Sequence, residues 1–299
     1  MQRLIIVSNR LPVIIEKRKN ELYFEPSVGG LATGLVSFHK SYNSVWIGWP
    51  GIDSEKIKGS EEEEIKTRLR SENCYPVFLS QNDVEDYYHG FCNRTIWPLF
   101  HYFTDHAVYK EDSWQAYERV NEAFSNAVVE VAEPGDIIWV HDYQLMLLPG
   151  FLRQRLSEAI VGFFLHIPFP SFETFRLLPW RKQILNGLLG SDLIGFHTYD
   201  YTRHFINSVH RLLGYEAVMG QITTPDRVIR ADVFPMGIDY KRYSSAAQGS
   251  KVRAEITKFR QKLGNRTIIL SIDRLDYTKG IPQRLEAFSV FLERHPEYK

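Results

Sequence analysis

Polar side chains that could bind or activate a substrate follow four short apolar runs of the sequence. They are Asn9 and Arg10 after LIIVS, His141 and Asp142 after IIWV, His166 after IVGFFL, and His197 after LIGF. Parallel strands end at the same edge of an open sheet, and ligands bind beyond that edge. We therefore expect a guanidinium, a carboxylate and several imidazoles to meet at one rim. For His141 and Asp142, the alternative is a buried hydrogen-bonded pair without a chemical role.

The segment VGGLATG, residues 28–34, contains the glycine pair Gly29 and Gly30 ahead of a predicted helix with small residues in its first turn. Such a helix start exposes backbone N–H groups and the positive end of the helix dipole, which together suit a phosphate. The segment has neither the Walker A pattern nor the G-x-G-x-x-G spacing. A tight turn is the alternative, and Arg10 at the end of the first strand favours the phosphate site.

Two cations, Arg274 and Lys279, stand in the segment DRLDYTKG between an apolar run and a predicted helix. An arginine fork and a mobile lysine at this spacing can bind one polyanion. A diphosphate leaving group needs such neutralisation as its bond breaks. The alternative is a solvated loop with surface charges.

Aromatic residues supply a further candidate surface, with Tyr88 in EDYYHGF and Trp97 in TIWPLFHYF. These rings can belong to the core, but amphipathic rings also serve as sugar platforms. The sequence has no His-Glu-x-x-His motif or aspartate-rich loop for a metal, and no G-x-S-x-G elbow for a serine hydrolase. We expect no metal and no cofactor.

The composition describes a folded globular protein without an excess of either charge. The chain has 299 residues, of which 44% are hydrophobic, and its 36 basic residues balance its 36 acidic residues. Nothing in these totals favours nucleic acid or an anionic membrane as a partner. Two cysteines without C-x-x-C spacing fit a reducing compartment, and no apolar run is long enough for a signal peptide or a membrane span. We expect a cytoplasmic protein.

Strand-like apolar runs alternate with helical periodicity along the chain, which predicts a doubly wound α/β fold with a mostly parallel sheet. Residues 13–26 resemble a separate hairpin, and residues 112–132 and 199–214 have helical spacing. A polar stretch around residues 234–243 marks a boundary. We expect one Rossmann-like domain at 1–237 and, at 238–299, the incomplete start of a second, with TIILSI (267–272) as its first strand.

Taken together, these segments resemble the trehalose-6-phosphate synthases, glycosyltransferase family 20. The motifs that carry the resemblance are SNRLP, GGLATGL, WIGWPG, EDYYHGF, WPLFHY, WVHDYQLMLLP, GFFLHIPFPSFETFRLLP, GFHTYDY and DRLDYTKGIPQR. The resemblance covers nearly the whole chain. It implies the GT-B arrangement of two facing Rossmann-like domains and retaining transfer of glucose from a nucleotide sugar, usually UDP-glucose, to glucose 6-phosphate.

The resemblance also assigns roles to residues of this sequence. It implies that Arg10, Tyr88 and Trp97 bind the acceptor and that the Gly29–Gly30 loop lies near the donor. It places Asp142 and His166 beside the donor sugar, and Arg274 and Lys279 on its diphosphate. The catalytic set is then Asp142, His166, Arg274 and Lys279.

The chain departs from the family pattern in two ways. Gln144 replaces the histidine that many members have in this motif, and the later acidic motif that holds the donor ribose and glucose is absent. We therefore expect an N-terminal fragment with acceptor domain 1–237, a truncated nucleotide-sugar domain 238–299, and no activity of its own. Two alternatives stay open, a glucosylglycerol-phosphate synthase and a non-catalytic sugar-phosphate-binding regulatory subunit. The sequence does not decide which base the donor carries. It does not decide the oligomeric state either, and a homo-oligomer stays open as an alternative.

Overall fold

The computed structural model describes residues 2–19, 21–27, 29–30, 34–36, 39, 42–264 and 266–298. The chain divides into two compact units, residues 1–236 and 237–299, which are described separately. The division falls one residue before the domain boundary expected from the sequence.

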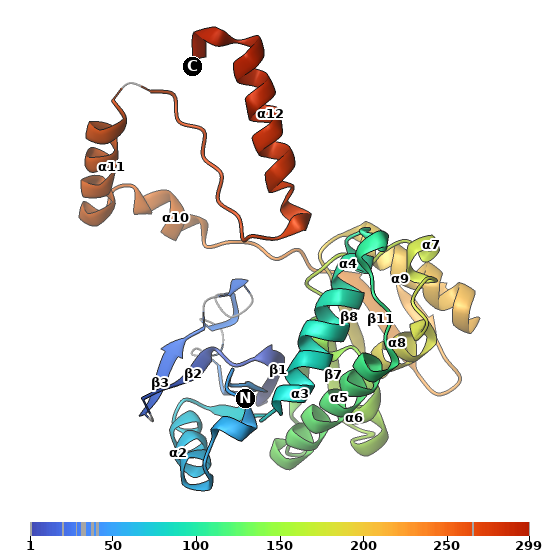
Figure 1. The fold of residues 1–299 in the computed structure, drawn as a ribbon. Coiled ribbons are helices and arrows are strands. Elements are labelled where there is room, and N and C mark those ends of the chain that lie inside the picture. The colour runs from blue at the N-terminus through green and yellow to red at the C-terminus, as the bar shows by residue number, and fades with distance from the viewer. Residues whose placement is uncertain are drawn as a thin grey trace. The chain divides into compact units, whose positions relative to one another are not determined.

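A nine-stranded sheet forms the centre of the first unit (Figure 1). In spatial order its strands are β5 (Cys74–Pro76), β4 (Ser44–Trp49), β1 (Leu4–Arg10), β6 (Ile137–His141), β7 (Ile160–Phe164), β8 (Leu193–Phe196), β11 (Val228–Val233), β10 (Gln221–Thr223) and β9 (Ala217–Val218). The strands from β5 to β11 run parallel, whereas β10 and β9 are antiparallel. The sheet is therefore the mostly parallel one that the sequence predicts.

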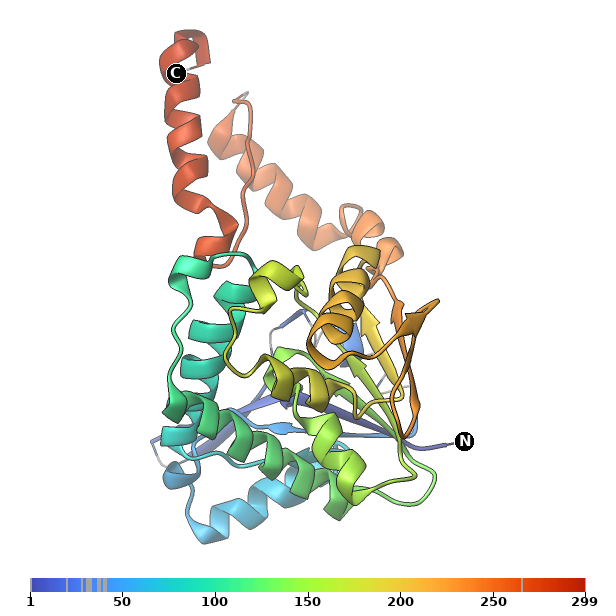
Figure 2. The same cartoon turned by 90° about the vertical axis from the view of Figure 1, so that its right-hand side faces the viewer.

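The helices of the first unit connect these strands and flank the sheet (Figure 2). Besides the helical residues 34–36, the helices formed by described residues are η1 (Ser54–Lys56), α2 (Gly59–Arg70), α3 (Gln81–Asp83), the π-helix η2 (Val84–Ile96), α4 (Trp97–Phe100), η3 (Thr104–His106), α5 (Glu111–Val131), η4 (Tyr143–Leu145), α6 (Leu148–Arg155), α7 (Phe172–Phe175), α8 (Arg181–Leu188) and α9 (Tyr199–Leu213). The predicted helices at 112–132 and 199–214 correspond to α5 and α9. As expected, Gly214 ends α9 with a left-handed φ of 77°, a conformation that costs glycine little.

Both faces of the sheet carry apolar side chains because its strands are apolar on successive residues. In β1, Ile5 and Val7 belong to the hydrophobic cluster that includes α5, α6, α8 and α9, while Ile6 belongs to a second cluster with Ile65 and Leu69 of α2. The doubly wound α/β prediction is confirmed. On this second face, strands β6, β7 and β8 line an apolar trough of about 520 Å³.

Two antiparallel features lie outside the parallel sheet core. The hairpin expected at 13–26 is formed by β2 (Val13–Arg18) and β3 (Glu21–Pro26). The short strands β9 and β10, which turn back beside β11 after α9, were not predicted from the sequence. With two and three residues, they are too short to show a hydrophobic pattern.

The second unit is helical. It contains α10 (Tyr240–Ala246), α11 (Ser250–Leu263), η5 (Tyr277–Lys279), α12 (Ile281–Arg294) and η6 (Pro296–Tyr298). The prediction of a strand at TIILSI is wrong. Residues 266–276 are not in a strand, and Ile268, Ile269 and Leu270 are 63%, 71% and 77% exposed. A strand requires a neighbour for its backbone hydrogen bonds, and the sheet pairings place none beside this segment among the described residues.

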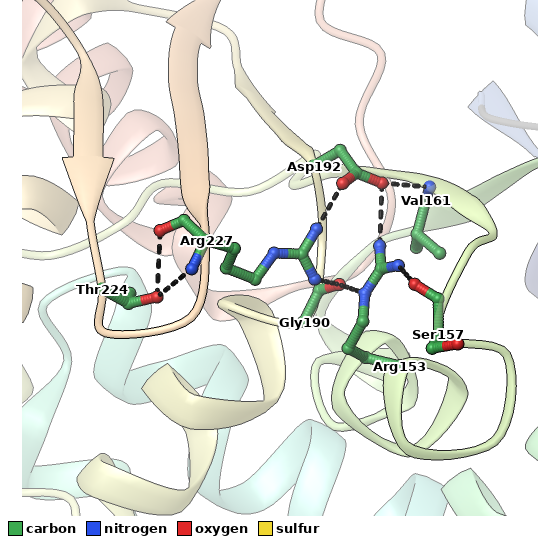
Figure 3. A network of polar contacts seen from close by, with 7 residues as sticks. All are labelled: Arg153, Ser157, Val161, Gly190, Asp192, Thr224 and Arg227. Atoms are coloured by element: carbon green, nitrogen blue, oxygen red, sulfur yellow. Dashed lines mark hydrogen bonds and ion pairs between the residues drawn. The ribbon is translucent and has the colours of Figure 1, made fainter.

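A polar network links the N-terminal ends of β7, β8 and β11 (Figure 3). The carboxylate of Asp192 accepts hydrogen bonds from Arg153 Nη2 at 2.8 Å, from the Val161 backbone N–H at 2.7 Å, and from Arg227. Both arginines also donate to the Gly190 carbonyl. One carboxylate thus balances two partly buried guanidinium groups.

Replacing Asp192 with alanine should lower the free energy of unfolding by about 2 kcal/mol. The change leaves two partly buried cations without their anion, and the exposure of Asp192 reduces the full cost of a broken buried pair. Urea unfolding followed by circular dichroism measures the change. Asp200→Ala is the matched control, because its pair with Arg203 is well exposed and should contribute well under 1 kcal/mol. Equal effects of the two changes would contradict the prediction.

Candidate active site

The strand order of the sheet reverses between β1 and β6. The chain passes from β1 outward to β4 and β5 and returns to β6 on the other side of β1, so the strand order reverses there. Ligands of open α/β sheets bind at such a reversal, beyond the carboxyl ends of the strands. Arg10 ends β1, Asp142 follows β6, His166 follows β7 and His197 follows β8. The structure therefore places these four residues along one rim.

On the β1 side, Arg10 lies against two aromatic rings. Its guanidinium carbon is 4.1 Å from the ring centroid of Trp49 and 5.6 Å from that of Tyr88. Within the described residues, Arg10 forms no ion pair with an acidic side chain. Stacking on aromatic faces holds an arginine in place while leaving its N–H donors available to an anion.

The turn after β4 leaves space for the side chain of Arg10. Gly51 has a φ of 89°, and a Cβ atom added there would lie 3.0 Å from Nη1 of Arg10 and 3.2 Å from Cγ2 of Ile14. A side chain at this position would be strained by its backbone and would crowd the guanidinium. Trp49 and Gly51 were missed as site residues, although the motif WIGWPG places both at the end of a strand on the same rim.

On the β6 side, Asp142 has an uncommon backbone conformation, with φ 74° and ψ 170°. Such a conformation costs a non-glycine residue on the order of 1–3 kcal/mol and persists where surrounding contacts impose it. Here the Asp142 N–H donates to the Phe164 carbonyl at 2.8 Å, and Oδ1 accepts from the N–H groups of Tyr143 at 3.0 Å and His166 at 3.1 Å. Burial raises the pKa of Asp142 to about 7, against the lowering effect of these two N–H groups.

The imidazoles next to Asp142 are uncharged at neutral pH. Burial lowers the pKa of His141 well below its ordinary value, and burial together with His197 lowers the pKa of His166 to about 3. Burial also lowers the pKa of His197. The alternative of a His141–Asp142 hydrogen bond is wrong, since Nδ1 of His141 lies 3.0 Å from Nε2 of His166 instead. The side chain of Asp142 instead accepts from the backbone N–H groups of Tyr143 and His166.

Buried side chains from α5 hold the loop that carries Asp142. The Tyr117 hydroxyl donates to the Tyr143 carbonyl at 2.8 Å and accepts from the Met146 N–H at 2.9 Å. The Asn121 side chain donates to the Gln144 carbonyl and accepts from the Leu148 N–H, both at 3.1 Å. These bonds fix residues 143–148 through backbone atoms. They therefore do not depend on having Gln144 in place of the histidine that many family members have.

The π-helix η2 and the start of α4 supply the aromatic residues of the rim. Tyr87 is fully buried and donates to Oδ1 of Asn9 at 3.0 Å, while its neighbour Tyr88 faces Arg10. Trp97 packs against Tyr143, with 5.8 Å between the ring centroids. A π-helix is rare, and π-helical turns are frequently found at functional sites. Side-chain patterning does not distinguish it from an α-helix, so the sequence could not predict it.

The remaining predicted residues take no part in the contacts described so far. Gly29 and Gly30 are exposed, with no atom within 4 Å of an added Cβ, and residues 31–33 lie outside the described part of the chain. Arg274 and Lys279 belong to the second unit, where Arg274 is 3.8 Å from Asp276 and Lys279 ends η5. The apolar trough meets the predicted site only at His166 and its neighbour His141.

The described residues form neither a metal-binding cluster nor a membrane-spanning helix. No group of three or more His, Cys, Asp or Glu side chains there could hold a metal ion. No helix formed by those residues is both long and apolar enough to cross a membrane.

The raised pKa of Asp142 predicts how stability depends on pH. The folded protein binds this proton more tightly than the unfolded chain, whose aspartate pKa is about 3.9, so the unfolding free energy should fall as pH rises from about 4 to about 7. Asp142→Asn removes this titration. Relative to wild type, the variant should gain on the order of 2 kcal/mol between pH 5 and pH 8, measured by urea unfolding.

Asp136→Asn is the control for this experiment. Although burial opposes it, the Arg3 guanidinium holds the pKa of Asp136 below its ordinary value, so this carboxyl is ionised at both pH values in the folded and unfolded states. The unfolding free energy of Asp136→Asn relative to wild type should therefore be the same at pH 5 and pH 8. If the unfolding free energy of Asp142→Asn relative to wild type were also the same at both pH values, the raised pKa of Asp142 would be contradicted.

Comparisons with known proteins identify the family. The chain is 48% identical over 99% of its length to the bifunctional trehalose-6-phosphate synthase/phosphatase of Thermoproteus tenax, of which it covers 41%. It is 43% identical over 99% of its length to the UDP-forming α,α-trehalose-phosphate synthase 1 of Aspergillus niger, of which it covers 58%. The chain thus spans about half the length of these curated relatives.

A solved structure described as trehalose-6-phosphate from E. coli bound with UDP-2-fluoro glucose matches 99% of the chain with a TM-score of 0.83 and 31% identity. The match covers 62% of that chain, and it confirms the expected fold as the N-terminal part of the GT-B type. The sequence model of glycosyltransferase family 20 matches residues 2–299. The chain therefore belongs to glycosyltransferase family 20.

Proposed function

We propose that this chain forms the acceptor-binding part of a retaining glucosyltransferase. The enzyme would move glucose from UDP-glucose to the anomeric hydroxyl of glucose 6-phosphate and release α,α-trehalose 6-phosphate and UDP. Family membership and the names of the relatives support this activity. In this proposal both sugars are substrates, and no metal or further cofactor takes part.

The observation that carries the proposal is the arrangement of Arg10. It lies at the strand-order reversal and stacks on Trp49 and Tyr88, and no acidic side chain of the described residues neutralises it. A permanent cation held in this way is suited to a phosphate, because guanidinium groups bind phosphate through paired hydrogen bonds. We assign the 6-phosphate of the acceptor to Arg10.

The other rim residues would hold the two sugars. Tyr88 and Trp97 offer ring faces and polar edges to the acceptor glucose. Asp142 and His166, which are joined through a backbone hydrogen bond, would bind hydroxyl groups beside the reacting carbon. Gly29 and Gly30 leave open space for the donor.

The reaction needs charge stabilisation at the leaving group. In the proposed step, the bond from the anomeric carbon to the UDP phosphate oxygen breaks as the acceptor oxygen bonds to that carbon on the same face. The acceptor proton passes to the departing phosphate oxygen, so no enzyme nucleophile is required. Arg274 and Lys279 would stabilise the growing negative charge on the diphosphate.

The activity would require more polypeptide than these 299 residues. The relatives extend well beyond the matched part, and the donor ribose and base would be bound by that further portion. We use the name extended protein for a protein that contains this chain and spans the full length of its relatives. The 299-residue chain should bind glucose 6-phosphate weakly and should not transfer glucose.

Arg10→Gln in the extended protein tests the acceptor site. Removal of the cation should raise KM for glucose 6-phosphate about 10- to 100-fold, the equivalent of ~1.5–3 kcal/mol for a hydrogen bond to a charged group. Because the phosphate is the assigned contact, the preference for glucose 6-phosphate over glucose should fall by a similar factor. Product formation by mass spectrometry, with both acceptors at several concentrations, measures the effect.

Arg68→Gln is the matched control for Arg10. Its guanidinium also lies over an aromatic ring, 3.9 Å from the centroid of Phe24, but on α2 away from the rim, so it should change neither constant. Equal losses with glucose and glucose 6-phosphate in Arg10→Gln would contradict the phosphate assignment. If the wild-type extended protein used glycerol 3-phosphate in preference to glucose 6-phosphate, the proposed acceptor would be wrong and glycerol 3-phosphate would take its place.

Arg274→Ala tests the donor site. Removal of one preorganised donor from the leaving group should lower kcat about 100-fold or more, with a smaller change in KM for glucose 6-phosphate. Steady-state kinetics of the extended protein give both constants. Arg253→Ala, an exposed change on α11 of the same unit, is the control and should behave as wild type. Near-normal turnover of Arg274→Ala would remove this residue from the mechanism.

A further inference from the structure

The imidazole of His141 is a buried group for which the proposed mechanism has no use. It ends β6, is 0% exposed, and contacts His166 through Nδ1 and Nε2 at 3.0 Å. The other nitrogen of His141, Nε2, is also buried and has no hydrogen-bond partner among the described residues. His166 stands at the rim, and its Nδ1 is not one of the buried unpartnered atoms.

Both rings carry a single proton at neutral pH, because burial lowers the pKa of each below the physiological range. A hydrogen bond between two neutral imidazoles needs one donor and one acceptor. Only two arrangements are then available. Either both rings are protonated at Nδ1 and His141 donates, or both are protonated at Nε2 and His166 donates.

The two arrangements differ in the atom that remains without a partner. If His166 donates, Nε2 of His141 carries a buried hydrogen that meets no acceptor. If His141 donates, the same atom is a bare lone pair. Buried N–H groups without partners are rarer in proteins than unfilled acceptors, and a lost donor bond carries the full desolvation cost.

We infer that His141 is a positioning residue: it donates its Nδ1 proton to Nε2 of His166 and so keeps the proton of His166 on Nδ1. The opposite edge of the His166 ring then presents an N–H donor toward the rim. The backbone N–H of His166 is held at the same time by Asp142. His141 thus fixes the orientation and the tautomer of His166 without contact with substrate.

The role of the His166 donor in substrate recognition rests on the proposed function. A hydroxyl group can accept or donate, but a donor fixed on His166 sets the role of the hydroxyl group that it meets. The sugar hydroxyl next to His166 must accept a hydrogen bond. Recognition of this kind discriminates against a sugar that lacks that oxygen.

Long-range proton–nitrogen correlation spectra of the ¹⁵N-histidine-labelled chain at pH 7 test the tautomers directly. We expect protonated Nδ1 and bare Nε2 on both His141 and His166, with the signals assigned by their loss in His141→Asn and His166→Gln. Protonated Nε2 on both rings, with Nε2–H of His141 directed at the adjacent Trp139 ring, would overturn the inference. This measurement needs no turnover, so it stands whether or not the proposed function holds.

Kinetics of the extended protein separate positioning from simple support of the fold. His141→Leu removes the donor and should lower kcat on the order of tenfold, as for outer-shell residues that orient a functional histidine. His141→Asn places an amide N–H where Nδ1 was and should recover most of that loss at a similar melting temperature. Equal impairment of both variants, or wild-type kcat in His141→Leu, would overturn the inference.

His39→Leu provides the structural control. His39 is also a buried histidine with both ring nitrogens hydrogen-bonded, but its partners Ser44 and Glu72 lie where the strands begin. It should lower the melting temperature and leave kcat unchanged. If the wild-type extended protein forms no trehalose 6-phosphate at all, the proposed function fails, and the spectra alone decide the tautomer.

Discussion

The reversal of strand order between β1 and β6 is the constraint on which the rest of the molecule depends. Right-handed crossovers place α2, which follows β4, on one face of the sheet and α6, α8 and α9, which follow β6, β7 and β8, on the other, where α5 also packs. The ends of β1 and β6 lie at the reversal, where η2 and α4 contribute Tyr88 and Trp97 to the rim. Val7 pairs with Val140 in the adjacent strands, so Arg10 and Asp142 emerge within a few residues of the same register. At the opposite edge, where β7, β8 and β11 begin, the Asp192 network joins these strands.

The rim combines several unfavourable features that the surrounding structure offsets. Asp142 has an uncommon backbone, its carboxyl is desolvated, and the neighbouring imidazoles are kept neutral by burial. Two backbone N–H groups stabilise the carboxylate, and Tyr117 and Asn121 hold the following loop through its carbonyl and N–H groups. A site supported through backbone contacts tolerates side-chain changes such as that at Gln144. It does not tolerate loss of the buried donors and acceptors beneath it.

Much of this arrangement could be predicted because it depends on local pattern. Continuous apolar runs indicated parallel strands, and the polar residues after them indicated the rim, since strand ends meet at one edge whatever the details of packing. Pairings across the sheet were harder. The partner of His141 depends on the face to which it points, and the role of Trp49 depends on a strand register that no local signal encodes. The apolar segment at 267–272 has strand propensity, yet propensity without a neighbouring strand makes no sheet. The functional roles of Arg10, Asp142, His166, Arg274 and Lys279 stay predictions.

Gly51 offers a practical guide to other sequences of this fold. Its positive φ strains any other residue, and an added Cβ would lie 3.0 Å from the end of the Arg10 side chain, which would have to shift by a few tenths of an ångström. A homologue with alanine or a larger residue there would carry this strain and a shifted guanidinium. Such a substitution would therefore disturb the arginine that the proposed function assigns to the phosphate, even where the arginine itself is still present.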